Sequence, residues 1–138
     1  MKAHFQLQWL YNNDSETSSA PRVLIDRLWP HGRTRSELSI DHWWPEAAPS
    51  NSLKREWTQE KMDWQRFARR YRDELHTDSS KTQRLLDLAQ QQAAIIMISQ
   101  ERDPEQSWPH ILQEFLTKAL DTAATSPPSN RGAADGLD

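Results

Sequence analysis

The sequence contains no cysteine and only three glycines among 138 residues. Without cysteine, the chain cannot form a disulfide, a thiolate nucleophile, an iron–sulfur cluster or a cysteine-type zinc site. The P-loop, GxGxxG, GxSxG and HExxH patterns are also missing, so nucleotide hydrolysis, dinucleotide binding, serine hydrolysis and zincin chemistry all lack their minimum signature. We therefore expect no cofactor and no metal site.

Long apolar runs and an excess of positive charge are missing as well. No segment approaches the roughly 18 to 20 consecutive apolar residues that span a bilayer, and residues 1–8 lack the apolar block of a secretory signal. We therefore expect a cytoplasmic protein with no membrane partner. Seventeen Lys and Arg stand against 20 Asp and Glu, a net charge of -3, which argues against a protein held on duplex DNA by overall positive potential. A local basic patch remains compatible with this balance.

Three segments have the pattern of β-strands. Residues 4–11 alternate between two faces, which predicts an edge or near-edge strand with one buried side. Residues 22–26 and 93–99 contain continuous aliphatic runs, which are typical of strands buried on both faces of a parallel sheet. The fold class predicted from these segments is α/β, with a small, open, mainly parallel sheet and helices packed on it.

The helical period appears between and after these strands. Ser50 or Asn51 can cap a short helix, and residues 64–75 place apolar side chains at intervals of three and four, which predicts a helix with Trp64 in the core. Asp78 or Ser79 can cap a third helix.

The last helix contains apolar pairs between Ile111 and Leu120. Its candidate caps are Asp103 and Ser107, and Pro109 favours the later start. Residues 121–138 have few large apolar side chains, so we expect a single domain over residues 1–120 and a disordered tail over 121–138. The oligomeric state is not predicted by any of these patterns.

The candidate ligand site lies in the loops that follow Ile25 and Ile98, because open α/β sheets bind ligands beyond the carboxyl ends of their strands. Residues 22–35 hold four arginines and one aspartate, and the second loop leads to a helix N-terminus. Arginine forks and helix N-termini suit a phosphate or carboxylate, so a small anionic ligand is the predicted partner. The residues predicted to form this site are Asp26, Arg27, Trp29, Gly32, Arg35, Arg102 and Asp103.

In this hypothesis Arg27, Arg35 and Arg102 hold the anion and Asp26 orients an arginine. A structural alternative is that the arginines tie down neighbouring carboxylates or loop carbonyls. Asp26, Glu101 and Asp103 also raise the possibility of a general acid–base pair between neighbouring strands, against which Asp103 fits a simple N-cap. The sequence does not decide whether the protein is an enzyme.

A second candidate is a nucleic-acid or acidic-protein interface over residues 54–72. This segment contains seven Lys and Arg against three acidic residues. Aromatic side chains interleaved with basic ones suit single-stranded nucleic acid, although an ordinary solvated helix face has the same composition. The residues of this alternative face are Lys54, Arg55, Trp57, Arg66, Arg69 and Arg70.

The segment from Arg22 to Gly32, RVLIDRLWPHG, is the most distinctive part of the sequence. With this segment and the matches that continue in register, the chain resembles the YeaO-like branch of the bacterial domain-of-unknown-function family 488. The further matches are Asp41, Trp43, residues 48–50, Leu53, Trp64, Phe67, residues 71–72 and 74–75, residues 102–103 and residues 114–116. The resemblance implies a compact α/β domain of bacterial cytoplasmic proteins and attributes no reaction to it.

The chain also departs from the pattern of that family. Trp9 and His31 stand where the family carries Arg, Pro45 where it carries Lys, and residues 106–108 where it carries a His-Asn-His-like segment. These departures raise a further hypothesis, in which an ancestral activity has been lost and a structural role retained.

Overall fold

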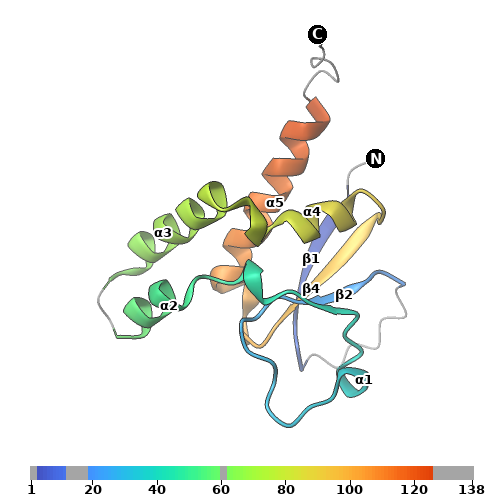
Figure 1. Cartoon of the computed structure of the whole chain (residues 1–138), viewed down its shortest axis with the longest axis horizontal. Coiled ribbons are helices and arrows are strands. Elements are labelled where there is room, and N and C mark those ends of the chain that lie inside the picture. The colour runs from blue at the N-terminus through green and yellow to red at the C-terminus, as the bar shows by residue number, and fades with distance from the viewer. Residues whose placement is uncertain (1–2, 12–18, 60–61, 126–138) are drawn as a thin grey trace.

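The computed structural model describes residues 3–11, 19–59 and 62–125. Its centre is a four-stranded sheet in the order β1-β4-β2-β3, in which every neighbouring pair is parallel (Figure 1). The strands are β1 (His4–Trp9), β2 (Arg22–Leu24), β3 (His42–Trp43) and β4 (Ala94–Ser99). The predicted parallel α/β sheet is thereby confirmed, with β1 at an edge as expected.

The strand β3 has no counterpart in the sequence-based prediction. It consists of only His42 and Trp43, and two residues are too few to show an alternating or continuous apolar pattern. Its place is fixed by pairing with β2, where Val23 lies opposite His42.

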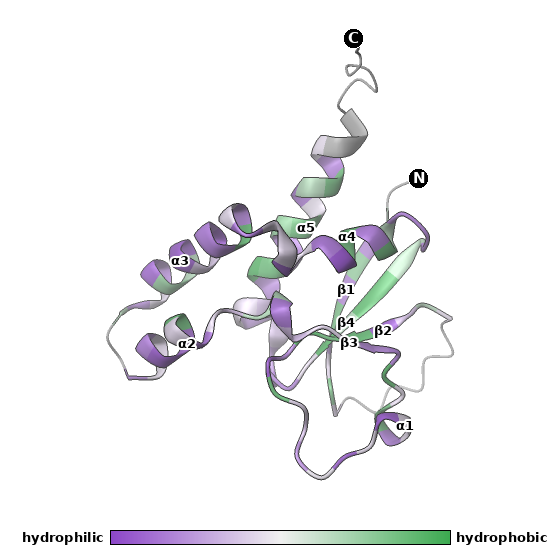
Figure 2. Cartoon of the chain, in the orientation of Figure 1, coloured by the Kyte–Doolittle hydropathy of each residue, from purple (hydrophilic) through white to green (hydrophobic). Residues whose placement is uncertain are grey.

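The central strand β4 supplies side chains to both faces of the sheet. Ile95 and Met97 belong to one buried cluster, and Ile96 and Ile98 belong to another. This division follows from the two-residue period of a strand, and it explains why β4 is apolar along its length (Figure 2).

The two faces are covered differently. The larger cluster lies under α2 (Asn51–Thr58), α3 (Trp64–Thr77), α4 (Gln83–Ala89) and α5 (Trp108–Thr125). The smaller cluster lies under the one-turn helix α1 (Arg35–Leu38), which Figure 1 shows apart from the other helices. Short 3-10 turns complete the elements: η1 (Pro45–Ala47), η2 (Ser79–Lys81) and η3 (Pro104–Gln106).

The helix starts depend on polar caps. The Ser50 hydroxyl accepts from the backbone amide of Leu53 and begins α2, as predicted. Asp78 caps the turn η2, and α4 begins later, at Gln83. Helix α5 begins directly after Ser107, at the later of the two predicted positions.

Two expectations need correction. Trp64 is 39% exposed rather than in the core, because it is the first residue of α3, where its ring packs on Trp57 and Phe67 from one side only. Helix α5 continues to Thr125, so the predicted tail is helical at its beginning, while residues 126–138 lie outside the described part of the chain. No helix among the described residues is long and apolar enough to span a membrane.

Candidate functional site

The carboxyl ends of β2 and β4 lie side by side, and Asp26 joins them. The backbone amide of Ile25 donates to the carbonyl of Ile98 at 3.0 Å. One residue further, Asp26 accepts from the Ser99 hydroxyl at 2.8 Å and from the Gln100 backbone amide at 2.6 Å. Burial raises the pKa of the Asp26 carboxyl above its usual value, and these hydrogen bonds oppose that shift.

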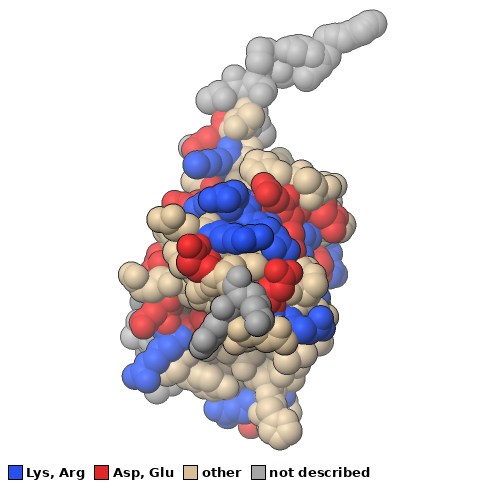
Figure 3. Space-filling view, turned by 90° about the vertical axis from the view of Figure 1, so that its left-hand side faces the viewer, with Lys and Arg blue, Asp and Glu red and all other residues tan. Residues whose placement is uncertain are grey.

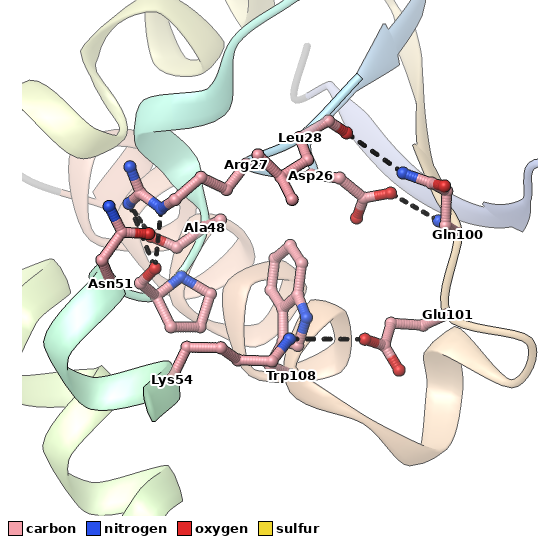
Figure 4. A pocket seen from close by; sticks show the side chains of 10 residues that line it. Asp26, Arg27, Leu28, Ala48, Asn51, Lys54, Gln100, Glu101 and Trp108 are labelled. Carbon is pink, nitrogen blue, oxygen red and sulfur yellow. Dashed lines mark hydrogen bonds and ion pairs between the residues drawn. The ribbon is translucent and has the colours of Figure 1, made fainter. Parts of the chain in front are cut away.

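Beside this junction is a pocket of about 370 Å³ between the strand ends and α2 (Figure 4). Asp26, Gln100 and Glu101 enter from the side of β2 and β4. The full lining consists of Asp26, Arg27, Leu28, Ala48, Pro49, Asn51, Lys54, Gln100, Glu101 and Trp108.

The wall formed by residues 47–50 is held by four side chains. Lys81, which is only 8% exposed, donates from Nζ to the Ala48 carbonyl at 2.8 Å. Arg27 donates to the carbonyl of Pro49, from Nη2 at 3.1 Å. The other two contacts are the Tyr71 hydroxyl on the Ala47 carbonyl and the Glu74 carboxylate on the Ser50 backbone amide at 2.9 Å.

This loop clamp, formed by Arg27, Tyr71, Glu74 and Lys81, fixes the entry into α2 and with it one wall of the pocket. Backbone carbonyls of a buried loop need donors, and here side chains supply them. Desolvation lowers the pKa of Lys81, and the nearby Glu74 carboxylate, 3.9 Å from its Nζ, opposes that shift.

The mouth of the pocket carries one ion pair. Lys54 Nζ lies 3.7 Å from a carboxylate oxygen of Glu101, and both side chains are partly exposed. Glu101 also accepts from the Ser107 hydroxyl at 3.2 Å. Exposed pairs of this kind contribute little to stability, about 0 to 1 kcal/mol, so a ligand can replace this contact.

Trp108 forms the floor of the pocket. Trp108 is 3% exposed, and Figure 4 shows its indole next to the ion pair of Lys54 and Glu101. The indole nitrogen has no hydrogen-bond partner within the described part of the chain. The Lys54 ammonium lies 6.0 Å from the centre of the same ring.

Of the predicted anion-site residues, only Asp26 and Arg27 line this pocket. The indole nitrogen of Trp29 donates to the Arg33 carbonyl at 2.7 Å, and Gly32 has a φ of 74° in the same exposed loop. Arg35 donates to the carbonyls of Ile40 and Asp41, on the side of the sheet that carries α1.

Arg102 and Asp103 of the second strand-end loop do not line the pocket. The Arg102 guanidinium lies 5.5 Å from the ring centre of Trp9 on β1, and Asp103 is exposed before η3. Because β4 separates β1 from β2, Arg27 and Arg102 lie on opposite sides of it. The predicted three-arginine grip is therefore not assembled, and Arg27 instead ties down loop carbonyls, as the structural alternative proposed.

Sequence reasoning missed much of the pocket. The sequence indicates Trp108 only as part of a segment that departs from the family, and Lys54 only as part of the alternative face. The Ser50 cap is the signal in the sequence that could have placed Asn51 and Lys54, because it fixes where α2 begins and how its first turn is oriented. The residues not predicted for this site are Leu28, Ala48, Pro49, Asn51, Lys54, Gln100, Glu101 and Trp108.

The alternative face over α2 and α3 has mixed charge. Figure 3 shows basic and acidic side chains interspersed there, and both guanidinium nitrogens Nη1 and Nη2 of Arg70 bond to Glu56 at 3.2 Å. Trp57 is half-buried against Phe67 and Trp64, so its ring faces are largely occupied. Arg55, Arg66 and Arg69 remain exposed, and nucleic-acid binding by this face stays a prediction.

Within the described residues, no group of three or more His, Asp or Glu side chains is placed to hold a metal ion. The two carboxylates of the pocket, Asp26 and Glu101, face cationic side chains across it (Figure 4). The arrangement can bind charged groups of either sign.

These features define a parallel α/β domain with a small pocket at the carboxyl ends of its central strands. Residues 4–132 match the family described as the inactive DUF488-N3 subclade, and the chain belongs to that family. The resemblance to domain 488 seen in the sequence is thereby confirmed.

The relatives are themselves uncharacterised. The chain is 31% identical to the uncharacterized protein YeaO of Escherichia coli K12 over 102 residues, which cover 74% of this chain and 88% of that protein. It is 37% identical to the uncharacterized proteins Rv3073c of Mycobacterium tuberculosis H37Rv and Mb3100c of Mycobacterium bovis over 68 residues, 49% of this chain and 57% of theirs. No solved structure matches the chain.

Proposed function

We propose that this domain binds, without transforming, a small molecule bearing a carboxylate or phosphate in the pocket between α2 and the ends of β2 and β4. The observation that carries the proposal is the buried indole N–H of Trp108, which has no acceptor among the described residues and belongs to a ring whose centre lies 6.0 Å from the Lys54 ammonium. Leaving a buried donor without an acceptor costs about 1 to 3 kcal/mol. An anionic oxygen at this position would accept from Trp108 and pair with Lys54.

The local electrostatics support an anion on this side of the pocket. Helix α2 begins at Asn51, and its first turn carries the positive end of the helix dipole. Lys54 follows one turn later, and its Glu101 contact of 3.7 Å is loose enough to be exchanged. The clamped loop keeps this wall in place before a ligand arrives, which lowers the cost of ordering on binding.

Binding without turnover is supported by the description of the family, which calls this subclade inactive. Trp108 also belongs to the segment in which this chain departs from the histidine-containing pattern of family 488. A tryptophan here offers a flat apolar surface and one hydrogen-bond donor, and it has no group that titrates near neutral pH.

The test is a thermal-shift screen of inorganic phosphate, sugar phosphates and small carboxylic acids against four proteins. A ligand at about 100 times its dissociation constant adds about 2.7 kcal/mol to the free energy of unfolding, which raises the melting temperature by several degrees. We expect this shift in the wild type and in the Arg69→Met control, whose side chain is exposed on α3. We expect its loss in Lys54→Met.

The fourth protein, Arg102→Met, separates this pocket from the site predicted by sequence. It should bind like the wild type, because Arg102 lies over Trp9 on β1. A shift that survives in Lys54→Met and disappears in Arg102→Met would contradict the proposal and restore the sequence-based site. If none of these anions raises the melting temperature, the proposed ligand class is wrong.

A further inference from the structure

We propose that the ligand is dipolar, an amino-acid-like molecule that carries a cationic amine together with its acid group. This inference rests on the proposed function and concerns the opposite wall of the same pocket. There lie the carboxylates of Asp26 and Glu101, and Glu101 pairs with Lys54 next to the indole of Trp108 (Figure 4).

The Asp26 carboxylate is held rigidly. It is 8% exposed, and its two oxygens accept from the Ser99 hydroxyl and the Gln100 backbone amide. The Gln100 side chain in turn donates to the Leu28 carbonyl at 3.1 Å, which joins the two strand-end loops. Each carboxylate oxygen has lone pairs for a further donor, so a ligand ammonium group can be received without breaking these bonds.

A purely anionic ligand leaves Glu101 without its present partner. Binding to Lys54 would displace Glu101 from its 3.7 Å contact and leave that carboxylate beside the ligand's own negative charge. Like charges within a few ångströms disfavour one another, and Asp26 on the same wall adds to the repulsion.

A dipolar ligand removes this conflict. Its acid group pairs with Lys54 and accepts a hydrogen bond from the Trp108 N–H. Its ammonium group pairs with Glu101 in place of Lys54. The number of ion pairs is then increased rather than reduced. The four groups involved carry two positive and two negative formal charges, counting Arg27, Lys54, Asp26 and Glu101, so the pocket has no net charge to favour an anion alone.

The size and the remaining lining suit a molecule of this class. The cavity of about 370 Å³ holds one small molecule, and Leu28, Pro49 and the Trp108 ring offer apolar surface to its body. Leu28 is 75% exposed in the described structure, which makes it an apolar rim available for a ligand to cover. An α-amino acid with an apolar side chain combines an acid group, an amine and an apolar body in one small molecule.

The experiment compares ligands that differ only in the amine. The probes are L-leucine with 4-methylpentanoate and L-phenylalanine with 3-phenylpropanoate, and inorganic phosphate is the simple anion. Isothermal titration calorimetry measures their affinities for the wild type, Lys54→Met, Glu101→Gln and the control Glu105→Gln, which lies outside the pocket on η3.

We expect each amino acid to bind the wild type and Glu105→Gln about tenfold or more tightly than its deaminated counterpart, the gain typical of a charge-assisted hydrogen bond. In Glu101→Gln this ratio should fall severalfold, because one of the two carboxylates available to the amine is gone and Lys54 is freed for the carboxylate. Lys54→Met should weaken both members of each pair.

The remaining outcomes are distinct. Equal affinity of both members for the wild type, or binding of phosphate but of neither amino acid, would overturn the dipolar ligand and leave an anion site. A ratio unchanged in Glu101→Gln would also overturn it, because the amine would then be recognised elsewhere. Failure of every probe would overturn this inference, whereas the proposed function is decided separately by the wider thermal-shift panel.

Discussion

Deleting the hydroxyl of Tyr71 tests whether the loop clamp stabilises the domain. Tyr71 is fully buried on α3, and its hydroxyl donates to the carbonyl of Ala47, which is also fully buried. Tyr71→Phe removes one oxygen and leaves that carbonyl without this donor. An unsatisfied buried polar group costs about 1 to 3 kcal/mol, and the substitution opens almost no cavity, so nearly all of the effect comes from the lost hydrogen bond.

The chain provides a matched control, because its only other tyrosine is Tyr11. Tyr11 is 39% exposed, and its ring lies under the Arg33 guanidinium, a contact that phenylalanine retains. We expect Tyr11→Phe to change stability by less than about 0.5 kcal/mol. Chemical denaturation followed by tryptophan fluorescence measures both variants. A Tyr71→Phe protein as stable as Tyr11→Phe would refute the role of the clamp.

Three further predictions concern single side chains. As the pH rises above about 4, the stability of Asp26→Asn relative to the wild type should increase, because burial raises the folded-state pKa of Asp26 and the wild type alone loses stability as that carboxyl ionises. Urea titrations at several pH values would show a flat difference if the reasoning is wrong. Gly32→Ala should cost about 1 kcal/mol, because Gly32 has a φ of 74°, and should leave ligand affinity unchanged; a calorimetric melt together with a binding titration checks both parts. Arg70→Met should cost less than about 1 kcal/mol, because its pair with Glu56 is exposed, and a larger loss on denaturation would show that this pair is structural.

Much of the fold could be predicted because local signals agree with the tertiary structure. The aliphatic run at residues 94–98 is buried on both sides in β4, and the apolar stripe of α3 places Phe67 and Tyr71 in the core. The strand β3 escaped prediction because its two residues are defined by pairing with β2 rather than by a pattern of their own. Trp64 has the right period for burial, but it stands at the start of its helix, where packing covers only one side.

The candidate site was predictable only in its location. The rule for open parallel sheets identifies the strand ends, and Asp26 and Arg27 are indeed there. The direction in which a loop side chain turns depends on its neighbours, and Trp9 attracts Arg102 to the far side of β4. Lys54 and Trp108 reach the pocket from helices that are distant in sequence, so no motif joins them to Asp26.

Several charged side chains near the pocket belong to the loop clamp, which binds them to the backbone of residues 47–50. Arg27 and Lys81 both donate to the carbonyl of Ala48, and Glu74 holds Ser50, so their charges fix the loop. Of the charged side chains in the pocket, Lys54 and Glu101 are partly exposed and pair with each other, while Glu101 also accepts from Ser107 and Lys54 lies over the Trp108 ring. Recognition in this account therefore depends on Lys54 and Glu101 more than on the arginines.

In the proposed complex, the indole N–H of Trp108 receives an acceptor from the bound ligand. Nitrogen-15 NMR observes the indole signals of the seven tryptophans directly, and Trp108→Phe assigns the one that matters. On titration with an amino acid or carboxylate that binds, we expect a downfield shift of the Trp108 indole proton and little change at Trp64 on α3, with no such shift in Lys54→Met. A Trp108 signal that stays in place while a ligand binds, or one that moves equally in Lys54→Met, would contradict it.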